Sequence, residues 1–246
     1  AGVDILGDSS FTRYVNTPVI TITTTMLVIL SGLGYPVWID LAKNIKMTIQ
    51  SKGKRPVGRT ITRLSLQSKI VLTMTLFLLT LGTVGFYLLE HHNPATMGTL
   101  NAAGKFQAAF FQSVTTRTAG FASISQSGLT NGSKLLACML MIVGGSPAGT
   151  AGGIKTTTVA VLLLTANKDT ECYGRKITFE IIRVAITITL VTFVFWLFGV
   201  TVMTVIEPQQ KVLDLMFEAT SAMATVGLTA DLTPVLSDIS HVVLML

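Results

Sequence analysis

Long apolar segments alternate with polar loops along the chain. Residues 17–38, 70–89 and 181–206 are each close to the roughly 20 residues that a helix needs to cross the hydrocarbon core of a bilayer. A fourth apolar segment, residues 134–164, is interrupted in its middle. Gly32, Gly34 and Pro36 in the first segment predict a bend, because glycine and proline weaken helices. The pattern predicts an all-α polytopic membrane protein.

Two shorter segments predict helices that enter the membrane without crossing it. Residues 110–121 (FFQSVTTRTAGF) and 217–228 (FEATSAMATVGL) align when Gly120 is placed on Gly227. Each predicts a half-helix followed by a short extended backbone at membrane depth. A third copy begins at the first residue, since Ala1-Gly2-Val3 matches the end of the other two. Copies at near-constant spacing indicate a repeat architecture.

The extended ends of these segments predict an ion pore. Backbone that leaves helical geometry inside a bilayer is tolerated only where it is packed in protein or lines a watery cavity. Thr-Val-Gly also opens the filter of potassium channels, where carbonyl oxygens replace the water shell of the ion. A single copy would more simply be a loop glycine after a buried helix, but recurrence favours a pore. The expected filter residues, with potassium as the bound ion, are Ala1, Gly2, Thr118, Ala119, Gly120, Thr225, Val226 and Gly227.

The interruption in residues 134–164 is rich in glycine, with the sequence GGSPAGTAGGIKTTT. A phosphate-binding loop is excluded, because Ile154 separates Gly153 from Lys155 and no strand precedes the segment. We expect a flexible plug that gates the pore below the filter; the alternative is close packing of small residues between helices. The expected gate residues are Gly144, Gly145, Ser146, Pro147, Gly149, Thr150, Gly152, Gly153 and Lys155.

Composition and charge support the membrane assignment and give its orientation. Half of the residues are hydrophobic and 12% are charged, compared with about 25% charged in soluble domains. Residues 40–69 hold eight cations and no acid after Asp40, which places this loop in the cytoplasm. A nucleic-acid site is excluded there, because the loop lacks interleaved aromatic residues and lies between spans. The loop at 165–183 is less one-sided but falls on the same side.

Isolated polar residues in the outer half leave alternatives open. Arg117 precedes the second filter, where its charge is costly unless it is paired or faces water. It either tunes ion entry or braces the filter by binding carbonyl groups behind it, and we favour bracing. Asp214 and Asp231 either concentrate cations or are solvated helix caps.

Metal, disulfide and catalytic sites are not expected. Glu90, His91 and His92 are interpreted as a solvated outer loop, since adjacent histidines point different ways and bind metal poorly as a pair. Cys138 and Cys172 offer no disulfide framework. The three histidines cluster with no nucleophile, so an enzyme is not expected.

Three segments, SVTTRTAGF, GGSPAGTAGGIKTTT and ATSAMATVGLT, resemble the Trk/Ktr/HKT superfamily of potassium transporters, and most closely its bacterial Ktr/Trk membrane subunits. The resemblance covers the whole chain. It implies units of helix, pore loop and helix, of which family members have four. Residues 1–64 would end the second repeat, 65–172 would form the third, and 173–246 would form the fourth without its last helix. The chain is therefore expected to be a fragment.

The resemblance implies potassium uptake across the plasma membrane by a multi-pass protein, through a carbonyl-lined filter gated by the glycine-rich loop. Sodium is a candidate second ion, and no cofactor is expected on this chain. Implied partners are a second copy, giving a homodimer, and a cytoplasmic nucleotide-binding regulatory subunit, whereas nucleic acid is not expected. The alternative is a non-conducting membrane scaffold or receptor derived from a cation transporter.

Overall fold

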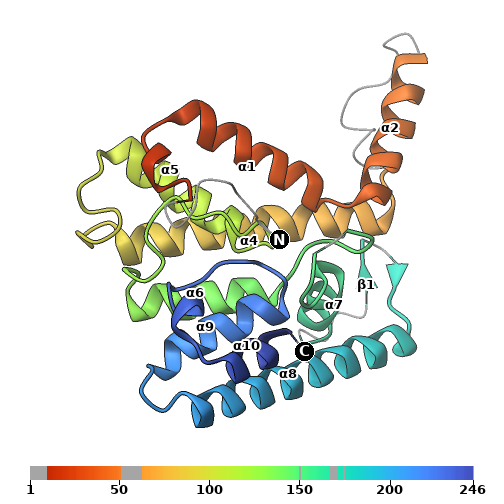
Figure 1. Cartoon of the computed structure of the whole chain (residues 1–246). Coiled ribbons are helices and arrows are strands. Elements are labelled where there is room, and N and C mark those ends of the chain that lie inside the picture. The colour runs from red at the N-terminus through yellow and green to blue at the C-terminus, as the bar shows by residue number, and fades with distance from the viewer. Residues whose placement is uncertain (1–9, 51–62, 150, 167–170, 174, 246) are drawn as a thin grey trace.

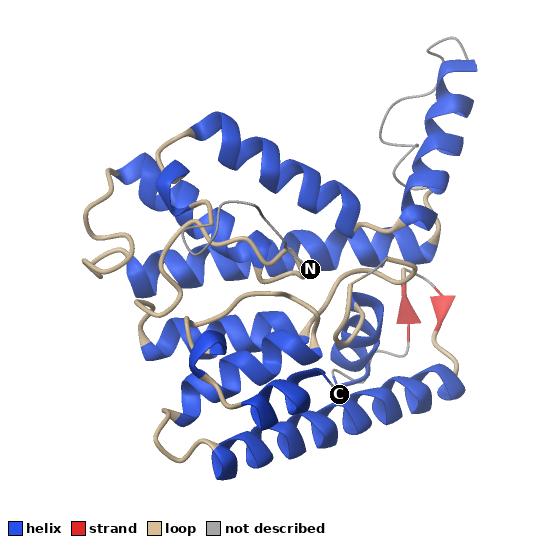
Figure 2. Cartoon of the chain, viewed as in Figure 1, coloured by secondary structure: helices blue, strands red, loops and turns tan. Residues whose placement is uncertain are grey.

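A computed structural model of the chain describes residues 10–50, 63–149, 151–166, 171–173 and 175–245, and these residues form a largely helical protein (Figures 1 and 2). The helices are α1 (Pro18–Gly32), α2 (Tyr35–Gln50), α4 (Leu66–Glu90), α5 (Ala102–Thr115), α6 (Asn131–Ile142), α7 (Thr156–Ala166), α8 (Phe179–Ile206), α9 (Val212–Met223) and α10 (Asp238–Met245), with 3-10 turns η2 (Thr12–Tyr14) and η3 (Thr233–Val235). A short antiparallel hairpin lies between α7 and α8. Its strands are β1 (Glu171–Cys172) and β2 (Arg175–Lys176). The predicted all-α class is confirmed.

Two described helices, α4 and α8, are each long and apolar enough to cross a membrane. The predicted span at 17–38 is long and apolar enough to be one span only if its two bent helices are taken together. It consists of α1 and the start of α2, which are bent by 91° at the break between them. Gly34 lies in this break with a φ of +78°, where a side chain would be strained and would meet the carbonyl oxygen of Pro147 at 2.7 Å. The sequence predicted a bend, but not a right angle.

The predicted re-entrant and broken elements are helices separated by non-helical chain. α5 and α9 end three and two residues before Thr118 and Thr225, respectively. The segment predicted as an interrupted span is α6 and α7, joined by the non-helical residues 143–155. We call residues 143–155 the gate loop and residues 118–120 and 225–227 the filter segments.

The main core lies where α5 and α9 pack against the longer helices. Phe86 of α4, Ala109 of α5, Met141 of α6 and Phe217 of α9 are buried in one cluster. Val226 of the second filter segment belongs to the same cluster. Burial of these side chains therefore fixes both half-helices and holds the filter segments in place.

Three helices begin on the same capping pattern, a serine or threonine followed three residues later by serine. The caps are Ser65 with Ser68 in α4, Thr130 with Ser133 in α6, and Ser237 with Ser240 in α10. In each case an acidic residue from an earlier part of the chain accepts hydrogen bonds from the cap. The acids are Asp40 for α4, Glu90 for α6 and Glu207 for α10.

Glu90 corrects the sequence interpretation of a solvated outer loop. Its side chain is fully buried. Its carboxylate accepts hydrogen bonds from Asn93 Nδ2 at 2.6 Å, from Thr96 Oγ1 at 2.5 Å and from the amide and hydroxyl of Thr130 at 2.9 and 2.8 Å. Burial of a carboxylate is tolerated when its oxygens are hydrogen-bonded, as they are here. Glu90 is thus a structural residue that joins α4 to α6.

Candidate functional site

The two filter segments have the same backbone conformation. Thr118 and Gly120 have φ values of +64° and +83°, and Thr225 and Gly227 have φ values of +54° and +92°, whereas the residue between each pair has a negative φ. A positive φ is accessible to glycine, but it is uncommon for a β-branched residue such as threonine. Strain of this kind costs about 1–3 kcal/mol and persists only where the surrounding structure imposes it.

The side chains of the filter segments alternate between the core and the accessible side. Val226 is fully buried and Ala119 is 8% exposed, so both middle side chains point into the protein. Thr225 and Gly227 are exposed. The accessible side of the segment around Val226 is therefore formed largely by main chain and by the threonine hydroxyl.

Hydrogen bonds tie the amide groups of the filter segments back to their half-helices. The amide of Ala119 donates to the carbonyl oxygen of Thr115 at 3.1 Å, and that of Val226 donates to the carbonyl oxygen of Ser221 at 2.8 Å. Among the described residues, no hydrogen bond reaches the carbonyl oxygens of 118–120 or 225–227. A carbonyl oxygen with free lone pairs is the group that replaces water around a potassium ion.

Different buried side chains support the chain that leaves each filter segment. After the first, the amides of Gln112 and Gln126 exchange hydrogen bonds of 2.7 and 3.1 Å. After the second, the carboxylate of Glu218 accepts from Thr229 Oγ1 at 2.7 Å, the Ala230 amide at 2.8 Å and Thr233 Oγ1 at 2.7 Å. Neither support was predicted from the sequence, because nothing local distinguishes these residues from other polar positions on a half-helix.

Main-chain hydrogen bonds join the two ends of the gate loop. The amide of Gly144 donates to the carbonyl oxygen of Ile154 at 3.0 Å, and the amide of Ile154 donates to that of Ile142 at 2.9 Å. A Cβ atom on Gly144 would overlap the carbonyl oxygen of Gly152, and Gly153 has a φ of +67°. Glycine is required at these positions because two main chains approach each other closely.

Contacts on two sides attach the gate loop to distant parts of the chain. The amide of Ser146 donates to the carbonyl oxygen of Gly32 at the α1–α2 bend, at 3.3 Å. The amide of Gly152 donates to Thr225 Oγ1 at 2.9 Å. The structure thus brings the predicted gate residues into direct contact with one filter segment. The amino group of Lys155 donates within the loop, to the carbonyl oxygen of Ala151.

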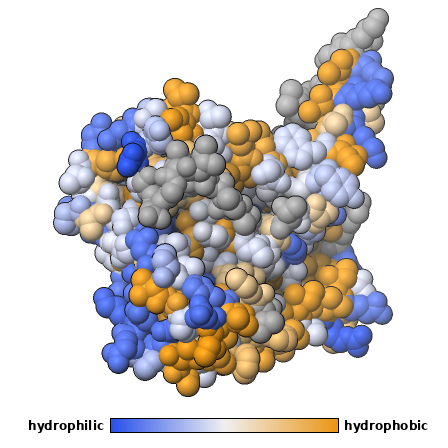
Figure 3. Space-filling view, in the orientation of Figure 1, coloured by the Kyte–Doolittle hydropathy of each residue, from blue (hydrophilic) through white to orange (hydrophobic). Residues whose placement is uncertain are grey.

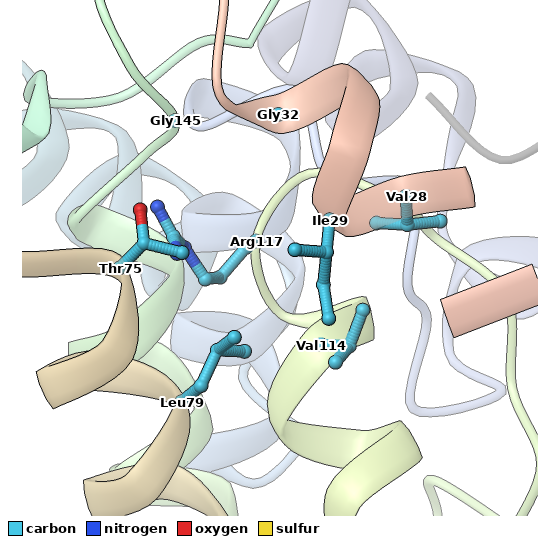
Figure 4. Close-up of a pocket in the computed structure, with 8 residues that line it drawn as sticks. All are labelled: Val28, Ile29, Gly32, Thr75, Leu79, Val114, Arg117 and Gly145. Atoms are coloured by element: carbon cyan, nitrogen blue, oxygen red, sulfur yellow. The ribbon is translucent and has the colours of Figure 1, made fainter. Parts of the chain in front are cut away.

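Arg117 does not make the contacts that the bracing interpretation requires. Its side chain points toward Thr75 and Gly145 (Figure 4). Its Nε atom is buried without a hydrogen-bond partner, as is Thr75 Oγ1, and between described residues no hydrogen bond joins the guanidinium to a carbonyl group. The cavity that it enters is also lined by Val28, Ile29, Gly32, Leu79 and Val114.

The outer acids that were candidate cation attractors have structural partners. Asp214 forms an ion pair of 2.6 Å with Lys134, which joins α9 to α6. Asp231 accepts a hydrogen bond of 2.5 Å from Ser127 in the segment that follows the first filter. Asp214 is therefore neither a free cation attractor nor a solvated cap. The sequence did not indicate its pairing, because Lys134 and Asp214 lie in different helices.

Some predicted site residues lie outside the described residues, namely Ala1 and Gly2 of the first filter copy and Thr150 of the gate loop. In the ranges that the structure describes, no group of three or more His, Cys, Asp and Glu side chains is arranged to hold a metal ion. Cys138 and Cys172 are both buried free thiols.

Comparison with known proteins gives one consistent result. The model of the TrkH family, described as cation transport protein, matches residues 1–246. The Ktr system potassium uptake protein B of Bacillus subtilis is 35% identical over 91% of this chain and 48% of its own length. The potassium/sodium uptake protein NtpJ of Enterococcus hirae is 32% identical over all of this chain and 53% of its own length.

The fold agrees with a solved member. The crystal structure of the potassium transporter TrkH from Vibrio parahaemolyticus matches with a TM-score of 0.72 at 16% identity, covering 99% of this chain and 51% of that one. The chain spans about half the length of the curated relatives named above. The family is one of transporters and not of enzymes, as expected from the sequence. The chain belongs to the TrkH family of cation transport proteins.

Proposed function

We propose that the chain supplies two filter segments and the gate of a potassium uptake pathway, with carbonyl oxygens as the ion ligands. The observation that carries this proposal is the pair of filter segments in which the middle side chain is buried and the carbonyl oxygens receive no hydrogen bond from described residues. The printed names of the relatives, which are potassium or potassium/sodium uptake proteins, support potassium as the ion and leave sodium as the second candidate.

The gate is assigned to the gate loop. The gate loop contacts Thr225 and so lies beside the second filter segment. Its main chains approach each other closely at Gly144, so the loop is compact without bulky side chains. A loop held by a few hydrogen bonds of about 1 kcal/mol each is suited to leave the pathway when a regulatory signal favours an open state.

The cellular context is part of the same proposal. Apolar helices α4 and α8 support a multi-pass location in the plasma membrane. The relatives called Ktr system proteins B are named as components of a system, which supports a further subunit for this protein as well. We assign that role to a cytoplasmic nucleotide-binding regulatory subunit and expect the membrane protein to form a homodimer.

The test is rubidium uptake by the full-length protein in cells that lack their own potassium uptake, with and without excess sodium. Gly120→Ala and Gly227→Ala place a side chain at positive φ in a filter segment, and we expect loss of potassium selectivity because the carbonyl groups are displaced. Gly199→Ala in α8 is the matched control, since a Cβ atom there meets nothing within 4 Å.

Unchanged selectivity in both filter variants would contradict the carbonyl filter. If the unmodified protein inserts normally but carries no rubidium even with the regulatory subunit present, the scaffold alternative is correct.

A further inference from the structure

Helix α2 runs crosswise to the helices around it. It is bent by 91° from α1, and Figure 1 shows it projecting from the rest of the protein across the direction of α1 and α4. Since α4 is a candidate membrane span, a helix perpendicular to that direction at its end lies along the membrane surface. α2 precedes the segment whose cations place it on the cytoplasmic side.

Three contacts hold α2 in this orientation. Trp38 Nε1 donates to the carbonyl oxygen of Leu30 at 2.9 Å, which satisfies a carbonyl group freed by the bend. Asp40 Oδ2 accepts from the Ser65 amide at 2.7 Å and from Ser68 Oγ at 2.6 Å at the start of α4. Val37, which is 1% exposed, packs against Val71 of α4. The right angle is therefore built into the fold.

A second face of α2, about a quarter-turn from the buried Val37, carries exposed apolar side chains. Trp38, Ile45 and Ile49 are 42%, 51% and 72% exposed, and their spacing of seven and then four residues puts them on one stripe. Figure 3 shows hydrophobic residues along one side of this helix and hydrophilic residues along the other. Lys46 is exposed beside the stripe and Lys43 is exposed on the next face around the helix, whereas the one acid of the helix, Asp40, is engaged at the start of α4.

We propose that α2 is an interfacial helix that binds anionic phospholipid in the cytoplasmic leaflet. An apolar stripe with lysines on the adjoining faces of the helix lies in the boundary between headgroups and acyl chains, while the lysines reach the phosphate groups. Each lysine near an anionic surface strengthens binding about fivefold. This assignment is separate from the ion pathway, because α2 contributes no filter or gate residue.

Lipid is favoured over a soluble regulatory protein as the occupant of this face. The stripe directly follows the apolar helix α1 and ends in residues that are more than half exposed, an arrangement that fits the depth of the acyl boundary. A soluble partner, or another part of the protein, is an outcome that the experiment distinguishes.

The first measurement is the depth of α2 in bilayer nanodiscs that contain the full-length protein. An environment-sensitive fluorophore is attached at Ile45→Cys, and quenching by lipids with shallow or deep nitroxide groups is compared. The matched positions are Gln209→Cys in the exposed loop after α8 and Val194→Cys on the exposed face of α8, which is 63% exposed. The two native cysteines are buried, so labelling of the unmodified protein gives the background.

We expect the label at position 45 to be quenched more by shallow than by deep nitroxides, with position 194 showing the reverse and position 209 showing neither. A label at position 45 that behaves like the one at position 209 would overturn the proposal. Protection that arises only when the regulatory subunit is added would also overturn it, in favour of a protein partner.

The second measurement is binding of phosphatidylglycerol relative to phosphatidylcholine, followed by thermal unfolding in detergent with added lipid. The variant Lys43→Gln/Lys46→Gln should lose about 25-fold in affinity for phosphatidylglycerol, whereas arginine at both positions should retain it. Lys176→Gln/Lys211→Gln removes the same charge from exposed positions elsewhere. Equal lipid dependence in the α2 variant and this control would contradict a role for the two lysines.

Discussion

The two filter segments have the same backbone conformation but different supporting side chains. Positive φ values recur at Thr118 and Gly120 and at Thr225 and Gly227. The chain leaving the first filter is held by a neutral pair of amides, Gln112 and Gln126, whereas the chain leaving the second is held by the carboxylate of Glu218. Backbone geometry is therefore the feature that the filter segments share, and several kinds of buried hydrogen bond can impose it.

The filter segments also differ in their contacts with the gate loop. The hydroxyl of Thr225 accepts the Gly152 amide, whereas Thr118 makes no side-chain hydrogen bond with the described residues. The filter is thus asymmetric where it meets the gate.

The largest expected effect is a difference in unfolding free energy between variants of Glu218 and Gln112, the residues that support the chain after each filter segment. Glu218→Ala leaves the buried donors of Thr229, Ala230 and Thr233 without an acceptor, so we expect a loss of about 3–5 kcal/mol in unfolding free energy. Gln112→Ala leaves the side-chain oxygen of Gln126 without a donor, while its Nε2 keeps the carbonyl oxygen of Ile124, and should cost about 1–3 kcal/mol. Chemical unfolding in detergent measures both, with the exposed Glu180→Ala as control. Equal losses of unfolding free energy in Glu218→Ala and Gln112→Ala would contradict a stronger support at Glu218 than at Gln112.

A second comparison is between Glu90 and Glu207, which accept hydrogen bonds from the N-terminal caps of α6 and α10, the helices that follow the two filter segments. Glu90 is fully buried, whereas Glu207 is only partly buried. Glu90→Gln places an amide donor against donors from Asn93, Thr96 and Thr130, and we expect a loss of about 2–3 kcal/mol in unfolding free energy. Glu207→Gln should cost clearly less, since water replaces its lost hydrogen bonds. A larger effect at Glu207 would contradict the importance of burial.

The gate contact predicts a functional difference between two equivalent threonines. Thr225→Val removes the acceptor for the Gly152 amide, which weakens the closed state by about 1 kcal/mol and should raise the open fraction about fivefold. Thr118→Val makes the same chemical change in the filter segment without that contact. Rubidium efflux from proteoliposomes should rise for the first variant and not for the second. Equal effects in both variants would indicate a change in the filter and not in the gate.

The smallest effect concerns pH. Hydrogen bonds from Ser237 and Ser240 lower the pKa of Glu207 below its ordinary value of 4.5. Because the folded-state pKa is lower than the unfolded one, the contribution to stability is present above pH 4.5 and is lost as pH falls through the folded-state pKa. The melting temperature of the unmodified protein should therefore fall more steeply in mild acid than that of Glu207→Gln. Parallel curves would contradict this assignment.

Much of the architecture follows from local pattern. Runs of about 20 apolar residues predicted α4 and α8, and glycines with Pro147 predicted the break between α6 and α7. The half-helices and their glycine ends were also predicted by alignment of residues 110–121 with 217–228. These features depend on residues that are neighbours in sequence, so they can be derived without contacts.

Other features depend on partners far apart in the chain. The pairing of Lys134 with Asp214, the burial of Glu90 by Thr130 and the contact of Gly152 with Thr225 each join separate helices or loops. Arg117 was expected to bind carbonyl groups, but it lies instead beside Thr75 and Gly145 (Figure 4). Sequence spacing does not tell which polar groups meet inside the protein.

The sequence by itself determined the helical membrane class, the spans α4 and α8, the bend after α1 and the glycine-ended half-helices, because hydropathy and glycine act locally. The tertiary structure decided the left-handed backbone of Thr118 and Thr225, the right angle between α1 and α2 and the single attachment of the gate loop to a filter. Each of these is imposed by packing and by hydrogen bonds from other helices, which overcome the local preference of the residue itself.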